Sequence, residues 1–356
     1  TLETLRSNIV KPTEDIIVAS DETLSSVDII LHWTFTTQST EDVLLATRTT
    51  VKGLTTSAIV GPAAIDTPLG AGDVHFGTLD VPYFLEPSEP GTLDLPSYDT
   101  TALGSCWEGA GAGGLGNCAA GPHVTQYNPV PTIKSTETIP LILTTPKLGG
   151  ACGNAAPANG WPVVIFQHGI TRNRGHVLAV ADSISQACMA AVAIDSPMHG
   201  IAGNETDGTA ALITDIERHF YLDLVSQDAD GNIIASGPDG QVDYLGAHFV
   251  NLANLLNTRD NLRQSVSDLF VLVDAIEEGT ITDGANPLDA SRIYYYGFSL
   301  GGISGTVFTA MEPNVKDAVL VFTGTSPVKI LDGSFNFGPP LHAALAANGI
   351  VKGTAD

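Results

Sequence analysis

The second half of the chain alternates short apolar runs with longer segments of helical periodicity. Four apolar runs read WPVVIFQHG (161–169), AAVAIDSP (190–197), RIYYYGFS (292–299) and DAVLVFTGTS (317–326). Uninterrupted runs of this kind are typical of parallel strands buried on both faces. Residues 176–190 and 258–279 have helical periodicity; one face of the second segment carries Leu262, Val266, Leu269, Phe270, Val273 and Ile276. Strands alternating with helices predict an α/β fold with a mostly parallel, doubly wound sheet.

The first half of the chain has a different pattern of residue types. Residues 1–60 are rich in threonine and alternate polar with apolar positions, as in SVDIILHWTFTTQST (26–40). This pattern predicts a β-rich N-terminal segment over 1–60, followed by the main α/β domain over 61–356. Residues 200–257 lie between a core strand and the long helix and form an insertion. At the carboxyl edge of the sheet such an insertion would be a lid, although its apolar residues fit a plain core equally well.

The stretch GFSLG (297–301) has the form G-x-S-x-G and lies between a predicted strand and a predicted helix, ISGTVFTAM (303–311). This context is that of the nucleophile elbow, in which a strained strand-to-helix turn exposes a serine. Gly297 and Gly301 would let strand and helix approach closely. We predict that Ser299 is a catalytic nucleophile; the alternative is a tight structural turn.

A serine that attacks a carbonyl needs N–H donors for the negative charge that develops on the carbonyl oxygen. Leu300 follows the nucleophile and would supply one backbone N–H. Ile170 would supply the other from the loop QHGIT (167–171), with His168 and Gly169 supporting the loop. An ordinary strand-to-helix turn is the structural alternative here.

The base that would activate Ser299 is harder to place. In the fold that carries this elbow, the chain order is serine, acid, histidine. His342 is the only histidine after Ser299, and Asp332 precedes it with no apolar run between them. Residues 337–349 predict a short helix that contains His342. We therefore expect the acid and the histidine to lie beyond residue 356, and keep Asp332 with His342 as an in-chain alternative.

These blocks, together with WTFTTQST, VPYFLEP and GAHFVNLANLLNTRDNLRQSVSDL, resemble the Pla-1/cef family of bacterial extracellular lipases, which includes a surface lysophospholipase. The resemblance implies an α/β-hydrolase fold and a serine esterase or lipase that is secreted or associated with the outer surface. It implies a small lipid or short-chain ester as substrate, with peripheral contact to membrane lipid. The family's usual histidine before the serine is Phe298 here, a departure that should change the packing of the elbow more than its chemistry.

Composition limits the partners. The formal charge is −24, a field that repels nucleic acid and anionic lipid surfaces. We expect no nucleic-acid partner, no cofactor and no metal: no Cys/His spacing indicates zinc, and DADGNI and PDGQVD lack EF-hand spacing. Arg172 and Arg174, after the loop 167–171, could meet a phosphate head group or be solvated. No charged leader with an apolar segment opens the chain, as in a mature or trimmed form. The sequence makes no prediction of oligomeric state.

The cysteines indicate export. Cys106 and Cys118 bracket a glycine-rich loop and predict a disulfide. Cys152 and Cys188 each precede a predicted strand and could also pair; a buried, reduced Cys188 is the alternative. Two function classes remain: a serine carboxylic ester hydrolase, and a non-catalytic surface or binding protein that retains the hydrolase scaffold.

Overall fold

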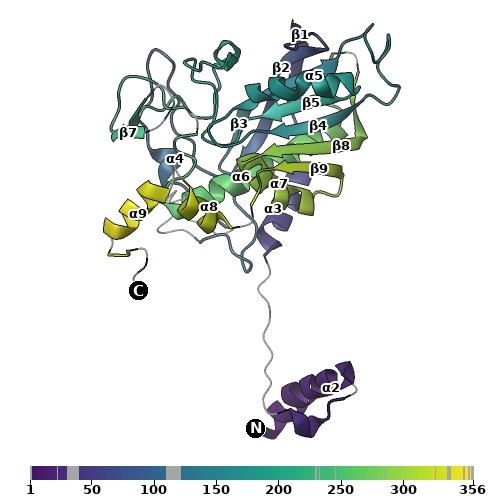
Figure 1. The fold of residues 1–356 in the computed structure, drawn as a ribbon, viewed down its shortest axis with the longest axis vertical. Helices are drawn as coiled ribbons and strands as arrows, with labels where there is room; N and C mark the ends of the chain where they lie inside the picture. The colour runs from purple at the N-terminus through teal and green to yellow at the C-terminus, as the bar shows by residue number, and fades with distance from the viewer. Residues whose placement is uncertain are drawn as a thin grey trace. The chain divides into compact units, whose positions relative to one another are not determined.

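The structure is a computed structural model that describes most of the chain. The described residues are 2–21, 23–29, 40–109, 122–228, 231, 233–244, 246–284, 286–324, 326–334, 338–347, 349–351 and 353. The chain divides into two compact units, Thr1–Thr40 and Glu41–Asp356, which are described separately (Figure 1).

The described residues before β1 are helical rather than β-rich. In the first unit, α1 (Leu2–Leu5), a π-helical segment (Arg6–Val10) and α2 (Lys11–Ser20) follow one another, and a 3-10 turn covers Ser26–Asp28. The second unit opens with α3 (Asp42–Lys52), and β1 (Ala58–Asp66) is the first strand. The prediction of a β-rich segment over 1–60 is therefore wrong for these residues. Most of the strand-like tract on which it relied, 30–39, lies outside the described residues.

The threonines of α3 explain why the strand prediction failed there. The buried positions Val43, Thr47 and Val51 recur every four residues, which is a helical period. Thr47 donates its hydroxyl hydrogen bond to the Val43 carbonyl at 2.8 Å, so its polar group is satisfied inside the helix. Threonine's preference for strands is overridden by this packing.

The second unit is built on a seven-stranded sheet with the order β1-β2-β3-β5-β4-β8-β9. β1, β2 (Gly72–Tyr83), β3 (Ser135–Pro146) and β5 (Ala190–Ile194) pair antiparallel in turn. β5, β4 (Trp161–Gln167), β8 (Leu288–Phe298) and β9 (Val315–Val321) pair parallel. All four predicted parallel strands are confirmed, as is the α/β-hydrolase fold class.

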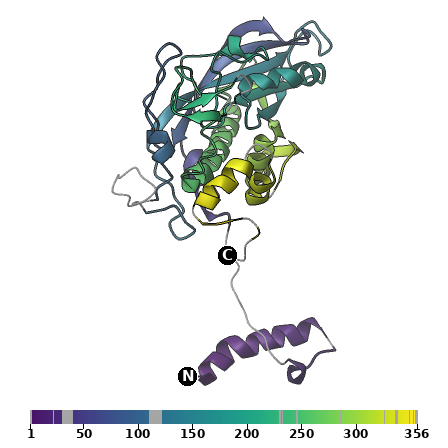
Figure 2. The same cartoon turned by 60° about the vertical axis from the view of Figure 1, so that its left-hand side comes forward.

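Helices cover both faces of this sheet (Figures 1 and 2). On one face, Val163 and Ile165 of β4 pack with α6 (Leu255–Glu277) and α7 (Leu300–Met311). On the other, Val164 and Phe166 pack in the cluster that includes α5 (Leu178–Gln186). Because successive strand residues point to opposite faces, an uninterrupted apolar run fills both cores at once.

The remaining elements are short. α4 (Thr101–Gly104) precedes the sheet's third strand, and 3-10 turns cover Arg174–Val177 and Thr209–Leu212. α8 (Pro327–Gly333) and α9 (Gly338–Ala347) follow β9. Within the described part of the chain, no helix is both long and apolar enough to cross a membrane.

The insertion 200–257 contains an antiparallel pair of short strands, β6 (Val225–Gln227) and β7 (Ile233–Ser236). Much of the rest is buried: Phe220, Leu222 and Phe249 share an apolar cluster with Leu300, the first residue of α7. The insertion therefore contributes to the core beside the start of α7; its role as a lid stays a prediction.

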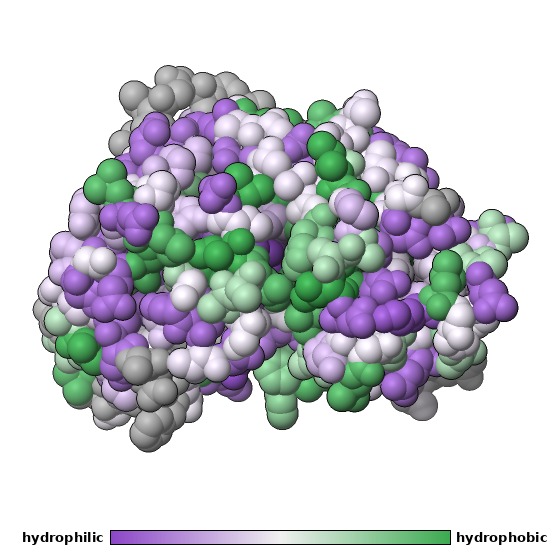
Figure 3. Space-filling view, turned by 90° about the horizontal axis from the view of Figure 1, so that it is seen from above, coloured by the Kyte–Doolittle hydropathy of each residue, from purple (hydrophilic) through white to green (hydrophobic). Residues whose placement is uncertain are grey.

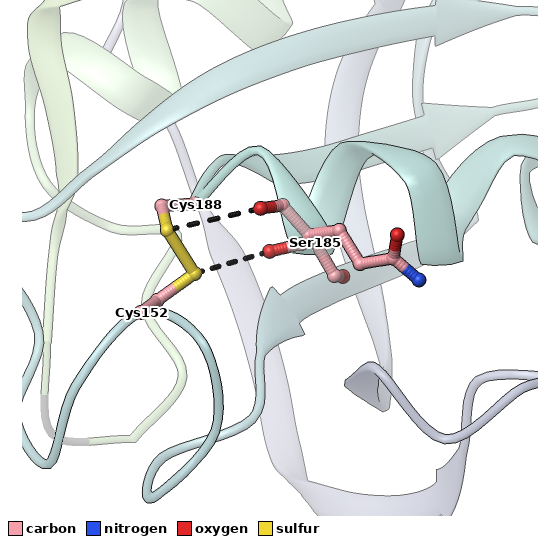
Figure 4. Close-up of a disulfide and its surroundings, with 4 residues drawn as sticks. Cys152, Ser185 and Cys188 are labelled. Atoms are coloured by element: carbon pink, nitrogen blue, oxygen red, sulfur yellow. Dashed lines mark hydrogen bonds between the residues drawn. A yellow bond between two sulfur atoms is a disulfide. The ribbon is translucent and has the colours of Figure 1, made fainter.

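Cys152 and Cys188 form a disulfide with an S–S distance of 2.11 Å (Figure 4). It joins the loop before β4 to the end of α5, and Cys152 Sγ lies 3.2 Å from the Ser185 carbonyl oxygen. Cys106 is buried, whereas its expected partner Cys118 lies outside the described residues, so that pairing stays a prediction.

Candidate active site

Ser299 lies at the turn between β8 and α7 in a strained backbone conformation. Its φ is 52° and its ψ −110°, angles that cost a non-glycine residue roughly 1–3 kcal/mol. Two hydrogen bonds hold the turn: Ser299 N–H donates to the Val321 carbonyl at 2.8 Å, and Ile303 N–H donates to the Ser299 carbonyl at 2.9 Å. The strand on one side and the helix on the other therefore fix the half-buried serine at the carboxyl end of the parallel strands.

The flanking glycines are required by close packing. A Cβ on Gly297 would lie 2.3 Å from the Gly301 carbonyl oxygen, and one on Gly301 would lie 2.2 Å from the Gln167 carbonyl oxygen. Gly301 thus brings the first turn of α7 against the end of β4, where the predicted oxyanion loop begins.

The tyrosines before the elbow also have structural roles. Tyr295 is buried and donates from its hydroxyl to the Gly301 carbonyl at 2.6 Å. Tyr296 points to the opposite face and stacks on Phe166, with 5.7 Å between ring centroids. Burial raises the pKa of Tyr295, so its hydroxyl stays protonated as a donor.

The loop after β4 meets Ser299 through Gly169. A Cβ on Gly169 would lie 3.0 Å from Ser299 Cβ and 3.1 Å from the Phe298 carbonyl oxygen, so only glycine fits this approach without displacement. The structure thus brings together the two segments that the sequence marked separately.

His168 fixes the conformation of this loop. Its Nε2 accepts a hydrogen bond from Ser196 N–H at 3.0 Å, which leaves the proton on Nδ1, and Nδ1 donates to the Gly169 carbonyl at 2.8 Å. Burial lowers the pKa of His168 to about 3, so the ring is neutral at pH 7. Because the Gly169–Ile170 peptide is trans, a fixed carbonyl also fixes the direction of the Ile170 N–H.

Among the described residues, neither predicted oxyanion donor has a competing acceptor. No described residue accepts a hydrogen bond from the Ile170 N–H, in a loop outside any helix or strand. Leu300 is the first residue of α7, so its N–H has no helical acceptor. The positive end of the α7 dipole adds to the attraction for a developing negative charge.

His199 supports His168 from behind, a contact that the sequence did not reveal. The two rings lie 4.8 Å apart between centroids, and His199 Nδ1 donates to the Pro197 carbonyl at 2.9 Å. A Cβ on Gly246 would lie 2.2 Å from His199 Nε2, so the insertion closes directly over this ring. No short sequence pattern could have signalled this, because residues 168, 199 and 246 meet only in the fold.

The sequence left open whether Arg174 meets a phosphate head group or is solvated. In the structure, Arg174 instead lies buried in a cluster of ion pairs. Its guanidinium bonds to Asp195 at 2.5 Å and to both oxygens of Glu217 at 2.7 Å. Arg218 adds a bond to the Asp195 carbonyl at 2.5 Å and an ion pair with Asp268 at 2.8 Å. The cluster joins the loop after β4, the end of β5, the insertion and α6.

Asp332 and His342 do lie together, but no bond joins them to Ser299. His342 Nε2 is 2.6 Å from Asp332 Oδ1, and both side chains are more than a third exposed. Among the described residues, none forms a hydrogen bond with the Ser299 hydroxyl. The structure therefore brings the predicted nucleophile close to the loop with a predicted oxyanion donor, and the roles of these residues, like the base, stay predictions.

Comparison with known proteins gives distant structural likenesses. No protein-family model and no curated protein sequence matches the chain. An acetyl xylan esterase from Paenibacillus sp. R4 is 15% identical with a TM-score of 0.44, over 87% of this chain and 68% of that one. Acetyl xylan esterase 1 from Thermoanaerobacterium sp. JW/SL YS485 is 13% identical with a TM-score of 0.43, over 86% of this chain and 66% of that one. A glucuronoyl esterase from Teredinibacter turnerae T7901 is 12% identical with a TM-score of 0.33, over 76% of this chain and 46% of that one.

The chain thus spans between about half and two thirds of the length of these proteins. The strand order and the strained serine between β8 and α7 define an α/β-hydrolase fold on their own.

Proposed function

We propose that this protein is a carboxylic ester hydrolase that works through an acyl-enzyme at Ser299. The observation that carries the proposal is the strained Ser299, packed against Gly169, together with two backbone N–H groups for which no described residue is an acceptor. A turn that needed only to reverse the chain would gain stability from relaxed angles.

The reaction follows from this geometry. Ser299 Oγ attacks the acyl carbonyl, its proton passes to the base, and the N–H groups of Ile170 and Leu300 bind the resulting oxyanion. The carbonyl reforms as the alcohol leaves with the proton, and water then releases the acid from the serine ester. Each oxyanion donor would supply roughly 3–4 kcal/mol of transition-state stabilisation.

We propose that the acid and the base lie beyond residue 356. The alternative within this chain is the pair Asp332 and His342. The substrate is proposed to be a lipid or short-chain ester, on the basis of the resemblance to extracellular lipases. The Cys152–Cys188 disulfide supports export to an oxidising compartment, since such bonds are rare in the cytosol.

A non-catalytic binding protein is the second candidate. The observation that favours it is the Ser299 hydroxyl, which has no hydrogen-bonded base among the described residues. A fluorophosphonate probe followed by peptide mapping separates the two, because the probe reacts only with an activated serine.

The experiment uses residues 1–356 and a chain extended past 356, each with Ser299→Ala and, as a control, Ser291→Ala at an exposed serine. Labelling at Ser299 that His342→Ala abolishes would place the base at His342. Labelling only in the longer chain would place it beyond 356. Absence of labelling in both chains would overturn the hydrolase and leave the binding protein.

A further inference from the structure

Two phenylalanine side chains pair beside the turn that carries Ser299. The rings of Phe298 and Phe322 lie 5.4 Å apart between centroids at an interplanar angle of 90°, the edge-to-face arrangement that aromatic pairs favour. Phe298 directly precedes Ser299 in the chain. Phe322 directly follows Val321, whose carbonyl accepts the hydrogen bond from the Ser299 N–H. Both rings therefore belong to the segments that hold the serine in place.

Phe322 is both exposed and strained. It is 78% exposed, and it is the only exposed phenylalanine among the residues that the structure describes. Its φ is 53°, a left-handed conformation that is an outlier for a bulky side chain. A turn that only reversed the chain would be more stable with glycine or asparagine at this position. Strain of this kind gathers at functional sites, and Ser299, with a φ of 52°, is the neighbouring example.

Phe298 links the exposed ring to the loop that carries the predicted oxyanion donor Ile170. A Cβ on Gly169 would lie 3.1 Å from Phe298 Cδ1 and 3.0 Å from Ser299 Cβ, so the loop packs against both residues. Phe298 is half-buried between this loop and Phe322. Apolar contacts therefore continue from the oxyanion loop, through Phe298, to a ring that is open to solvent beside the serine.

We propose that Phe298 and Phe322 bind an apolar group of the ester whose carbonyl Ser299 attacks, on its acyl or its alcohol side. This inference rests on the proposed function and makes the substrate an ester with an apolar substituent. Such a group would cover the exposed ring of Phe322, which is favourable in proportion to the apolar area removed from water. A polar group in the same place would lose water without gaining a hydrogen bond, since neither ring has a polar atom.

Binding of intact esters to the Ser299→Ala protein, measured by titration with nuclear magnetic resonance detection, tests the proposal. Methyl hexanoate and pentyl acetate are isomers that carry the same pentyl group on the acyl side and on the alcohol side, and methyl acetate lacks it. We expect one isomer or both to bind about tenfold more tightly than methyl acetate, as the burial of roughly two methylene groups would give. Equal binding of all three esters would overturn the proposal.

Two variants, each made together with Ser299→Ala, test the location. Phe322→Asn removes the ring and should fold, because asparagine tolerates the left-handed conformation. It should weaken the tighter isomer about fivefold and leave methyl acetate unchanged, whereas Phe322→Tyr keeps the ring and should keep the affinity. Tyr127→Asn, at an aromatic residue that is 89% exposed, is the matched control and should change nothing. Unchanged binding to Phe322→Asn, or an equal loss in Tyr127→Asn, would contradict the location.

The comparison of the two isomers tells which side of the ester lies on the rings; tighter binding of either supports the shared chemistry. The measurement needs neither the nucleophile nor the base. Absence of labelling at Ser299 would overturn the proposed function and leave this binding result standing, whereas absence of an effect at Phe322 would overturn only the apolar subsite.

Discussion

Ser299, Gly169 and His168 show how single residues set the chemistry of this site. The serine's backbone is strained, and Gly169 leaves room for close approach of the loop. His168 is held neutral, so its Nε2 can accept a hydrogen bond from Ser196 N–H while its Nδ1–H donates to the Gly169 carbonyl. A Cβ at position 169 would crowd Ser299, and a protonated His168 could not accept from Ser196 N–H.

The strain at Ser299 predicts an inverted order of stability between two variants. Glycine in place of alanine usually destabilises a protein, by roughly 0.5–1 kcal/mol. At a φ of 52° and ψ of −110°, however, glycine avoids the strain that alanine retains. We expect the free energy of unfolding of Ser299→Gly to exceed that of Ser299→Ala by about 1 kcal/mol, as measured by urea denaturation. An alanine variant as stable as the glycine variant would show that the turn is unstrained.

The neutral histidines predict a dependence of stability on pH. Burial lowers the pKa of both His168 and His199 from 6.5 to about 3. As the pH falls below 6.5, these two histidines become protonated in the unfolded chain but stay neutral in the folded one. The contribution of the two histidines to stability is therefore present above about pH 6.5 and is lost as the pH falls toward 3. The free energy of unfolding should therefore decrease between pH 6.5 and 5.

His199→Phe tests this dependence, because it retains a ring against His168 but cannot titrate. The slope of the free energy of unfolding against pH should flatten by up to about 1.4 kcal/mol per pH unit. Exposed His123→Gln is the control and should leave the slope unchanged. An unchanged slope in His199→Phe would mean that the ring is protonated in the fold.

At the scale of elements, buried ion pairs join helices and loops that are far apart in the sequence. Arg48 of α3 bonds to Asp274 of α6 at 2.8 Å and to Glu312 after α7 at 2.6 Å. Arg174, in the loop after β4, bonds to Asp195 at the end of β5 and to Glu217 of the insertion, and so joins these three segments. α3 thereby belongs to the hydrolase domain, although the sequence placed it in a separate N-terminal segment.

Removal of Arg48 should therefore destabilise the whole domain. Arg48→Ala leaves the buried carboxylates of Asp274 and Glu312 without this partner, which costs about 3–5 kcal/mol in comparable pairs. Chemical denaturation of the variant measures the loss. Lys147→Ala breaks an exposed pair with Asp66 and serves as the matched control, with little change expected. Equal effects of the two substitutions would refute a structural role for the α3 contact.

At the scale of the whole molecule, the excess of acidic residues gives a strong negative field. Figure 3 shows hydrophobic and hydrophilic side chains interspersed over the face on which β1 lies. Exposed apolar residues of β1 include Ile59 and Ile65, 70% and 46% exposed. Their strand contains Pro62, which cannot donate a hydrogen bond to a further strand and so discourages edge-to-edge association.

The net charge of −24 predicts that salt stabilises the fold. Self-repulsion destabilises a compact state and is screened as the Debye length falls from about 30 Å at 0.01 M to about 8 Å at 0.15 M. The thermal midpoint should rise by a few degrees over this range, measured by circular dichroism. NaCl and KCl should give the same curve, because screening depends on ionic strength. A falling midpoint would mean that favourable ion pairs outweigh the repulsion.

The parallel strands, the helices α5, α6 and α7, and the turn that carries Ser299 could all be predicted from the sequence. These features are local, since the run of apolar residues and the spacing of glycines are complete within about ten positions. Gly297 and Gly301 could be marked from the motif alone, although the atoms they approach could not.

The folded structure alone reveals which distant residues meet. It paired Cys152 with Cys188, buried Arg174 between Asp195 and Glu217, placed His199 behind His168, and made the threonine-rich α3 a helix docked on α6. Each of these outcomes depends on contacts between positions tens to hundreds of residues apart. Local propensity carries no information about such contacts, and burial against a partner overrides it where the two disagree.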